Sequence, residues 1–175
     1  MKLKYFAGIG SRKYPKKEKE IIKSLAYDLV NLGYILRSGG ASGADSYWEE
    51  YYDLYGGQKE IYLPFKDFNK NKSPFFGVSE AALNLAEKYH PKWSACSPIA
   101  KLLHARNGYQ VLGNDLKTPV DFIICWTPDG LKSGGAAQAT RIAEDKHIPI
   151  YNIKNINELH QIQFVLSSEK IMHSI

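Results

Sequence analysis

The stretch Arg37-Ser38-Gly39-Gly40-Ala41-Ser42-Gly43-Ala44-Asp45 lies between the apolar run Tyr34-Ile35-Leu36 and an aromatic, acidic segment at residues 47–52. This pattern predicts a strand that ends in glycines, followed at once by a helix. Glycine leaves backbone N–H groups unshielded, and the N-terminal end of a helix favours an anion. We therefore interpret the stretch as a candidate phosphate-binding loop, with a simple tight turn as the alternative.

Two more loops of this kind occur in the chain. Gly8-Ile9-Gly10-Ser11-Arg12 follows a strand-like segment at residues 3–7. Residues 126–130, continuing to Ser133-Gly134-Gly135, follow another at residues 120–125. The carboxyl ends of parallel strands meet at one edge of a sheet, so we expect the three loops to converge there.

Length, cysteine content and charge limit the class of protein. A chain of 175 residues fits one domain, residues 1–175, that buries roughly 70% of its unfolded surface. Cys96 and Cys125 are too far apart for a disulfide framework or a zinc motif, which favours a reducing, cytoplasmic setting. No apolar run approaches the ~20 residues of a membrane span, so we expect a soluble protein with no membrane partner.

The net charge of +5 favours anionic ligands. The lysines between residues 13 and 23 alternate with Glu18 and Glu20, however. On a helix this pattern is more typical of a solvated face than of a nucleic-acid footprint.

Apolar periodicity and helix signals give the order of elements. Helices are expected at 15–33, 44–55, 79–89, 98–112, 134–146 and 155–168, and strands at 3–7, 34–36, 60–63, 120–125 and 148–153. Residues 65–113 form a loop and a two-helix insertion. This order predicts an α/β, Rossmann-like, doubly wound and mainly parallel five-stranded sheet, in the order 3-2-1-4-5, with helices on both faces.

The ordered combination of residues 8–12, residues 38–45, Arg106-Asn107 and Gly134-Gly135 resembles the SLOG superfamily. That superfamily joins the Rossmann domain of DNA processing protein A (Smf) with the lonely-guy nucleotide phosphoribohydrolases. The chain is most similar to small stand-alone members found in bacteriophage genomes. The resemblance covers about residues 3 to 153.

The resemblance implies a Rossmann-like fold whose glycine loops hold the phosphates of nucleotides or of single-stranded DNA. It implies that Ser11 and Ser38 donate hydroxyl hydrogen bonds and that Arg12 and Arg106 offer bidentate forks. Asp45 would accept from a ribose hydroxyl or tether its loop. The residues expected at the ligand are Gly10, Ser11, Arg12, Ser38, Gly39, Gly40, Ala41, Gly43, Asp45, Arg106, Asn107, Gly134 and Gly135.

Trp126 and Thr127 complete the expected site because they end the central strand. Trp126 would either stack on a base or cap the core, and the core interpretation is slightly favoured.

One departure from the family pattern concerns catalysis. The phosphoribohydrolases resemble one another in a Pro-Gly-Gly-x-Gly-Thr-x-x-Glu stretch, and Arg141 stands where its acid should be. Glycosidic cleavage normally needs a carboxylate near the anomeric carbon. Asp45, Asp115 or Asp129 would be the substitutes. We expect no catalytic residue, and the sequence favours binding over catalysis.

The remaining patterns give no further site. His90, His104, His147, His160 and His173 show no ligand spacing with cysteine or acid, so we expect no metal and no required cofactor. The tyrosines at 47, 51, 52 and 55 fall at helical spacing and are assigned to the core or to an oligomer interface, and we expect a homo-oligomer.

The sequence therefore favours a nucleotide-binding protein that senses or sequesters a phosphorylated nucleotide, such as an ADP-ribose-like or cyclic nucleotide signal. The first alternative is a single-stranded-DNA-binding recombination mediator like DNA processing protein A. The second is a nucleotide N-glycosidase.

Overall fold

A parallel β-sheet forms the centre of the protein, which a computed structural model describes from Met1 to Ile175. The sheet has five strands in the order β3-β2-β1-β4-β5, and every neighbouring pair runs parallel. The predicted α/β, Rossmann-like class and the order 3-2-1-4-5 are confirmed, and no strand is antiparallel. The strands are β1 (Lys4–Gly10), β2 (Tyr34–Ser38), β3 (Lys59–Ile61), β4 (Phe122–Trp126) and β5 (Ile150–Asn152).

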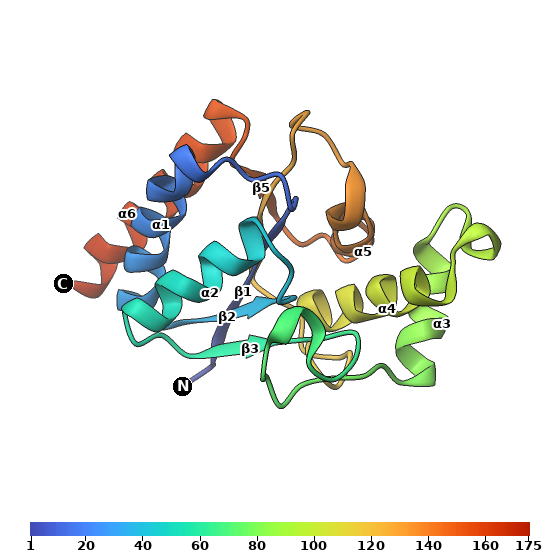
Figure 1. The fold of residues 1–175 in the computed structure, drawn as a ribbon. Coiled ribbons are helices and arrows are strands. Elements are labelled where there is room, and N and C mark those ends of the chain that lie inside the picture. Colours follow the sequence, from blue (N-terminus) through green and yellow to red (C-terminus); the bar gives the residue numbers. More distant parts are fainter.

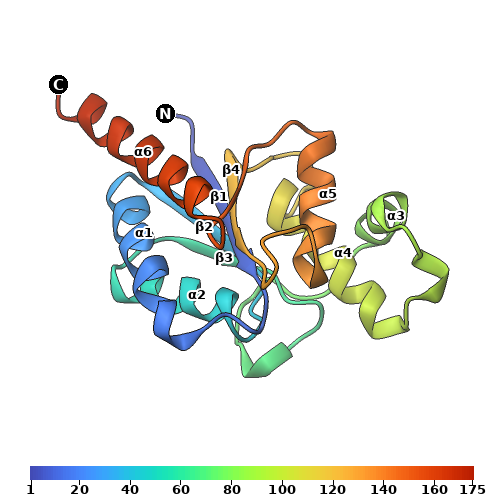
Figure 2. The ribbon, with the colours of Figure 1, turned by 90° about the horizontal axis from the view of Figure 1, so that it is seen from above.

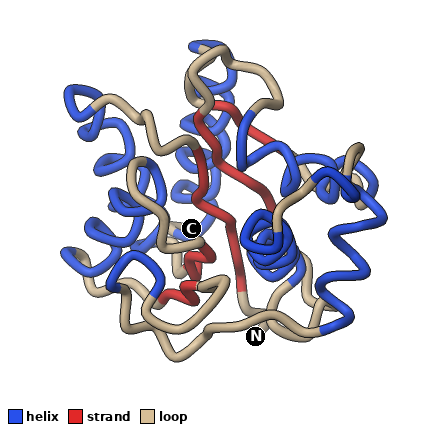
Figure 3. The backbone as a smooth tube through the Cα atoms, turned by 45° about the vertical axis from the view of Figure 1, so that its right-hand side comes forward, coloured by secondary structure: helices blue, strands red, loops and turns tan.

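Helices cover both faces of this sheet (Figures 1 and 2). One face carries α1 (Lys19–Asn31), α2 (Ala44–Leu54) and α6 (Ile156–His173). The other carries α4 (Pro98–Leu112) and α5 (Ala137–Asp145), and α3 (Glu80–Tyr89) packs on the outer side of α4. Figure 3 shows the strands enclosed between the two groups of helices. Short 3-10 turns complete the chain: η1 (Lys16–Glu18), η2 (Phe68–Lys70), η3 (Trp93–Ala95) and η4 (Gly134–Ala136).

Two apolar layers hold the helices to the sheet. On one face Phe6 and Leu36 pack with Trp48 of α2, and on the other Ile9 and Ile123 pack with Ile142 of α5. All of β4 is buried, as a strand covered on both faces requires. Side chains along each strand alternate between the two layers, so the sheet cannot slip by one residue without exposing both.

Local signals explain where most helices begin and end. Ser79 and Ser97 cap α3 and α4 by accepting from the backbone N–H groups of Ala82 and Ala100, and Gly113 ends α4, as the sequence predicts. The C-terminal helix runs to His173, beyond the predicted end at residue 168. No helix in the chain has both the length and the apolar character that crossing a membrane requires.

Gly8 is a point in the sheet where no larger residue fits. A Cβ there would lie 2.8 Å from the Trp48 ring and 2.9 Å from Leu36 Cδ1. We expect Gly8→Ala to lower the free energy of unfolding by roughly 1–3 kcal/mol in urea denaturation, because an overpacked core must shift. Gly135→Ala is the matched control, since a Cβ at Gly135 meets open space. If both variants lost the same free energy of unfolding, the cause would be the backbone conformation of glycine rather than the clash.

Candidate functional site

A pocket of about 750 Å³ opens at the carboxyl edge of the sheet, a size suited to a small-molecule ligand. Its walls come from the loops after β1, β2 and β4 and from one side of α4. Successive strands are added on one side of β1 up to β3 and on its other side from β4 onward, so the strand order reverses between β1 and β4. Ligands of open α/β sheets bind beside such a switch point. The three glycine-bearing loops thus converge, as expected.

The structure divides the expected site residues into two groups. Those that line the pocket are Gly10, Ser11, Arg12, Ala41, Asp45, Arg106, Asn107, Gly134 and Gly135. Those that lie outside its lining are Ser38, Gly39, Gly40, Gly43, Trp126 and Thr127.

The loop after β2 already holds an anion, the carboxylate of Asp45. This side chain is buried, and its Oδ2 accepts a hydrogen bond from the backbone N–H group of Ala41 at 3.4 Å. Burial raises the pKa of Asp45 to about 6, although Arg106 and this N–H group oppose the shift. At least one N–H group that the sequence offered to a phosphate, that of Ala41, therefore binds a carboxylate of the protein, and Asp45 tethers its loop.

Arg106 is also committed to the protein rather than offered as a fork. It is 5% exposed, its Nη1 donates to the carbonyls of Gly39 and Tyr62, and its Nε donates to Asn107 Oδ1 at 3.1 Å. Burial lowers the pKa of Arg106 to about 10, with Asp45 opposing the shift. Arg106 thus supports the wall of the pocket, and any ligand meets only the remaining edge of its guanidinium.

Glycines in the same loop are explained by packing. A Cβ at Gly39 would lie 2.5 Å from Arg106 Nη1, and one at Gly43 would lie 2.5 Å from the carbonyl oxygen of Ser11. Gly43 also has a φ of +83°, which L side chains rarely adopt. Gly39 thus allows α4 to approach the loop after β2, and Gly43 allows the loop after β1 to approach it.

Three further expected residues are structural in this geometry. The Ser38 hydroxyl donates to the carbonyl of Gly8 at 2.6 Å, and the Thr127 hydroxyl donates to the carbonyl of Leu131 at 2.6 Å. Trp126 is buried and packs edge-on against Tyr14, with ring centres 5.3 Å apart. Its placement matches the core interpretation rather than base stacking.

An uncapped helix start lies at the beginning of the η4–α5 segment. Gly134 and Gly135 begin this helical segment, whose first N–H groups have no preceding turn to bond, and no side chain caps them. Asn107 holds the segment by donating from Nδ2 to the carbonyl of Gly135 at 2.9 Å. A helix end of this kind attracts an anion through its dipole and its free N–H groups.

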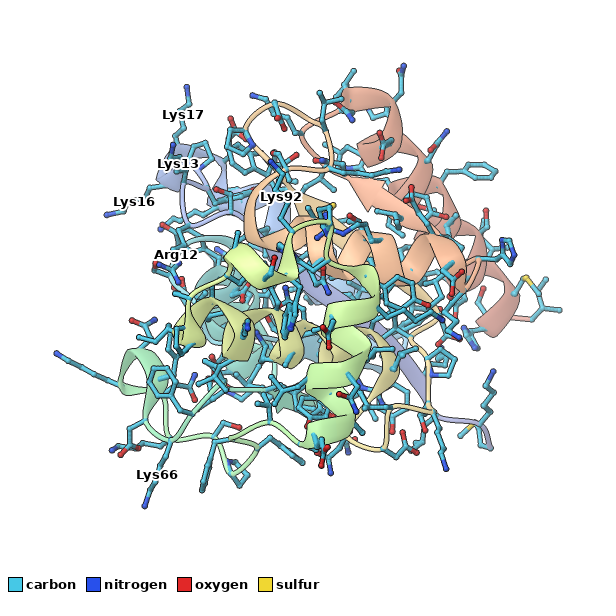
Figure 4. All side chains as sticks on the ribbon, turned by 90° about the vertical axis from the view of Figure 1, so that its right-hand side faces the viewer. Arg12, Lys13, Lys16, Lys17, Lys66 and Lys92 are labelled. Carbon is cyan, nitrogen blue, oxygen red and sulfur yellow. The ribbon has the colours of Figure 1, made fainter.

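Two cations stand at the same pocket without a partner. Arg12 and Lys13 line it, are exposed, and belong to none of the ion pairs of the protein. The Oγ atom of Ser11 accepts from the Lys13 backbone N–H at 3.0 Å, which leaves its hydroxyl hydrogen available to a ligand. Figure 4 shows Arg12 and Lys13 on the same side of the molecule as Lys16 and Lys17.

Sequence reasoning did not place Lys13, Gln110, His90 or His104 at the pocket, yet all four line it. Lys13 directly follows the Gly8–Arg12 loop, and this adjacency was the available signal. The histidines gave no signal, because they lie on different helical segments. The structure brings His90 and His104 together with Cys96, with their ligand atoms within 4.8 Å of one another.

No protein-family model matches the chain, and no curated protein matches it in sequence. Solved structures do match. DNA processing protein A (DprA) from Streptococcus pneumoniae superposes with a TM-score of 0.55 at 17% identity, covering 86% of this chain and 50% of that one. The chain has a DprA-like fold. It spans half the length of that protein, and at this identity the likeness shows the fold alone.

Two further structures match the chain more loosely. The DprA of Helicobacter pylori, described by its unique single-stranded DNA binding mode, has a TM-score of 0.48 at 20% identity over 84% of this chain and 63% of its own. A molybdenum cofactor carrier protein from Chlamydomonas reinhardtii has a TM-score of 0.45 at 13% identity over 95% and 99%. A shared fold does not decide what a pocket binds, which depends on the residues that line it.

Proposed function

We propose that the protein binds a phosphorylated nucleotide in the pocket at the carboxyl edge of the sheet. The observation that carries this proposal is the meeting of an uncapped helix start at Gly134 and Gly135 with two unpaired cations, Arg12 and Lys13, in one cavity of about 750 Å³. Helix N–H groups and charged forks are complementary to phosphate oxygens. Leu103 and Pro128 supply apolar surface for a base or a sugar.

Sensing or sequestration agrees with this pocket better than glycosidic cleavage does. Asp45 is the only carboxylate in the lining, and it already accepts a hydrogen bond from the backbone N–H group of Ala41. Asp129 accepts from the Ser133 hydroxyl at 2.8 Å and lies outside the lining. Arg141, at the position of the family's acid, donates to Gln138 Oε1 at 2.7 Å. These arrangements support binding of an intact nucleotide.

Isothermal titration calorimetry tests the proposal. We expect binding of one or more of a panel of nucleoside phosphates, ADP-ribose and cyclic dinucleotides, and no binding of the parent nucleosides, because the phosphate carries the recognition. Absence of binding by every member of the panel, with the protein folded, would contradict the proposal.

Single-stranded DNA is the second candidate, favoured by the position of Arg12, Lys13, Lys16 and Lys17. All four are exposed, none forms an ion pair, and Figure 4 shows them gathered beside one another. For single strands, the logarithm of the binding constant falls with the logarithm of salt by about 0.7 per phosphate contacted. Tight oligonucleotide binding with a slope of several units would favour DNA, whereas a shallow slope and a preferred mononucleotide would favour the first proposal.

A further inference from the structure

A set of three side chains, two of which line the pocket, has the composition of a transition-metal site. His90 follows the last residue of α3, Cys96 follows η3, and His104 lies on α4. Their ligand atoms lie within 4.8 Å of one another. Imidazole nitrogen and thiolate sulfur are the ligands that Zn²⁺ prefers.

The distances are close to those of a tetrahedral centre. Bonds of about 2.3 Å to sulfur and about 2.1 Å to nitrogen place two ligand atoms about 3.6 Å apart at a tetrahedral angle. Cys96 Sγ lies 3.7 Å from each ring nitrogen of His90. The imidazole rings of His90 and His104 have centres 4.4 Å apart. Rotation of the His90 ring and a small contraction of the cluster would bring the three atoms onto one ion.

The groups are chemically free to ligate. The His104 ring forms no hydrogen bond to the protein. The His90 ring contacts Cys96 Sγ, and its Nδ1 accepts from the Lys92 backbone N–H, in the turn that Figure 4 marks by Lys92. Burial, together with the neighbouring charges of His90, Arg141 and Arg106, lowers the pKa of His104 to about 4. Burial and Arg141 lower the pKa of His90.

The surrounding charge is positive, because Arg141 lies near both rings and Arg106 lies near that of His104. A divalent cation needs a negative ligand to offset this. The Cys96 thiol, which now donates to the carbonyl of Lys92 at 3.6 Å, supplies it by releasing its proton to solvent as the metal–sulfur bond forms.

We propose that His90, Cys96 and His104 form a zinc site with three protein ligands at the mouth of the pocket. Three ligands leave one tetrahedral position for water or another ligand, the arrangement of zinc sites that keep an open position. Both histidines line the pocket, so that position opens toward it. An anion bound at Gly134 and Gly135 would share the cavity with the ion. The proposal does not depend on nucleotide binding.

Cobalt titration of the purified full-length chain, stripped by a chelator, tests the site. We expect one equivalent of Co²⁺ to bind, with a thiolate-to-cobalt charge-transfer band in the near ultraviolet, and Zn²⁺ to displace it. Cys96→Ser should abolish that band. His104→Ala should weaken binding by at least about 100-fold, the upper end of the loss seen when only an outer-shell partner is removed.

The exposed His160, remote from the cluster in sequence, provides the control. His160→Ala should bind Co²⁺ as the unmodified protein does, and circular dichroism of all variants verifies the fold. The proposal is overturned if the unmodified protein binds no Co²⁺, or if it keeps the same affinity and spectrum after replacement of Cys96 and His104.

Discussion

Replacing Arg106 with methionine should lower the free energy of unfolding at pH 7 by about 3–5 kcal/mol, the usual cost of leaving a buried charge without the opposite charge that compensates it. Arg106 and Asp45 are both buried, and each opposes the shift in the other's pKa. Without Arg106, an ionised Asp45 carboxylate would have no neighbouring positive charge in the interior, which favours its protonated form. Urea denaturation at pH 7 measures the loss.

The stability lost in the Arg106→Met variant should depend on pH. Burial already raises the pKa of Asp45 from 3.8 to about 6, and removal of Arg106 raises it further. A group whose pKa is higher in the folded state favours folding at low pH, so the variant should regain stability as the pH falls from 8 toward 5.

Asp45→Asn in the same chain should recover part of the loss at pH 7. The exposed Arg12→Met should change stability by no more than about 0.5 kcal/mol. A loss that is equal at both ends of this pH range would show that the cavity, and not the charge, dominates.

Replacing Arg12 and Lys13 together with alanine should weaken nucleotide binding by about 100-fold or more. A hydrogen bond to a charged group contributes about 1.5–3 kcal/mol, and these two side chains are the unpaired cations of the pocket. Stability should not change, because both side chains are exposed. Calorimetry with the tightest ligand of the panel measures the effect.

Lys66 provides the matched control for this double variant. It is an exposed lysine without an ion pair, and Figure 4 shows it at the end of the view opposite Lys17. Lys66→Ala should leave affinity unchanged. If it weakened binding as much as the double variant did, the ligand would be held by the overall charge of the protein rather than by this pocket.

The fold could be predicted from the sequence because the sequence signals for its elements are local. The apolar run at 120–125, the glycines after each strand, and the Ser97-Pro98 helix start each depend on near neighbours. Together with the right-handed crossover they leave few topologies. Strand ends were less accessible, since β2 extends through Arg37 and Ser38 although both are polar. Arg37 is buried there, and its charge is compensated by an ion pair between its Nε and Glu60 Oε2 at 2.8 Å. Glu60 lies 23 residues away in the sequence.

The site was only partly accessible for the same reason. The sequence located the loops that converge, but it could not tell which donors were already engaged. Ser38 donates to Gly8 and Arg106 to Gly39 and Tyr62, and these partners become neighbours only after folding. The cluster of His90, Cys96 and His104 depends on how the turn between α3 and α4 packs, which no residue spacing encodes.

Asp45 acts as a tethered counter-ion. A glycine loop that binds a soluble anion has free or hydrated backbone N–H groups until the anion binds. In this loop the Asp45 carboxylate offsets the partial positive charge of the N–H groups as soon as the chain folds. The acid is the second residue of α2, so the residue that decides whether such a loop is vacant lies just after the glycines. Where a strand–glycine–helix sequence carries an aspartate at that place, we expect the glycines to form a structural turn. The ligand is then expected at a neighbouring loop that has no such aspartate.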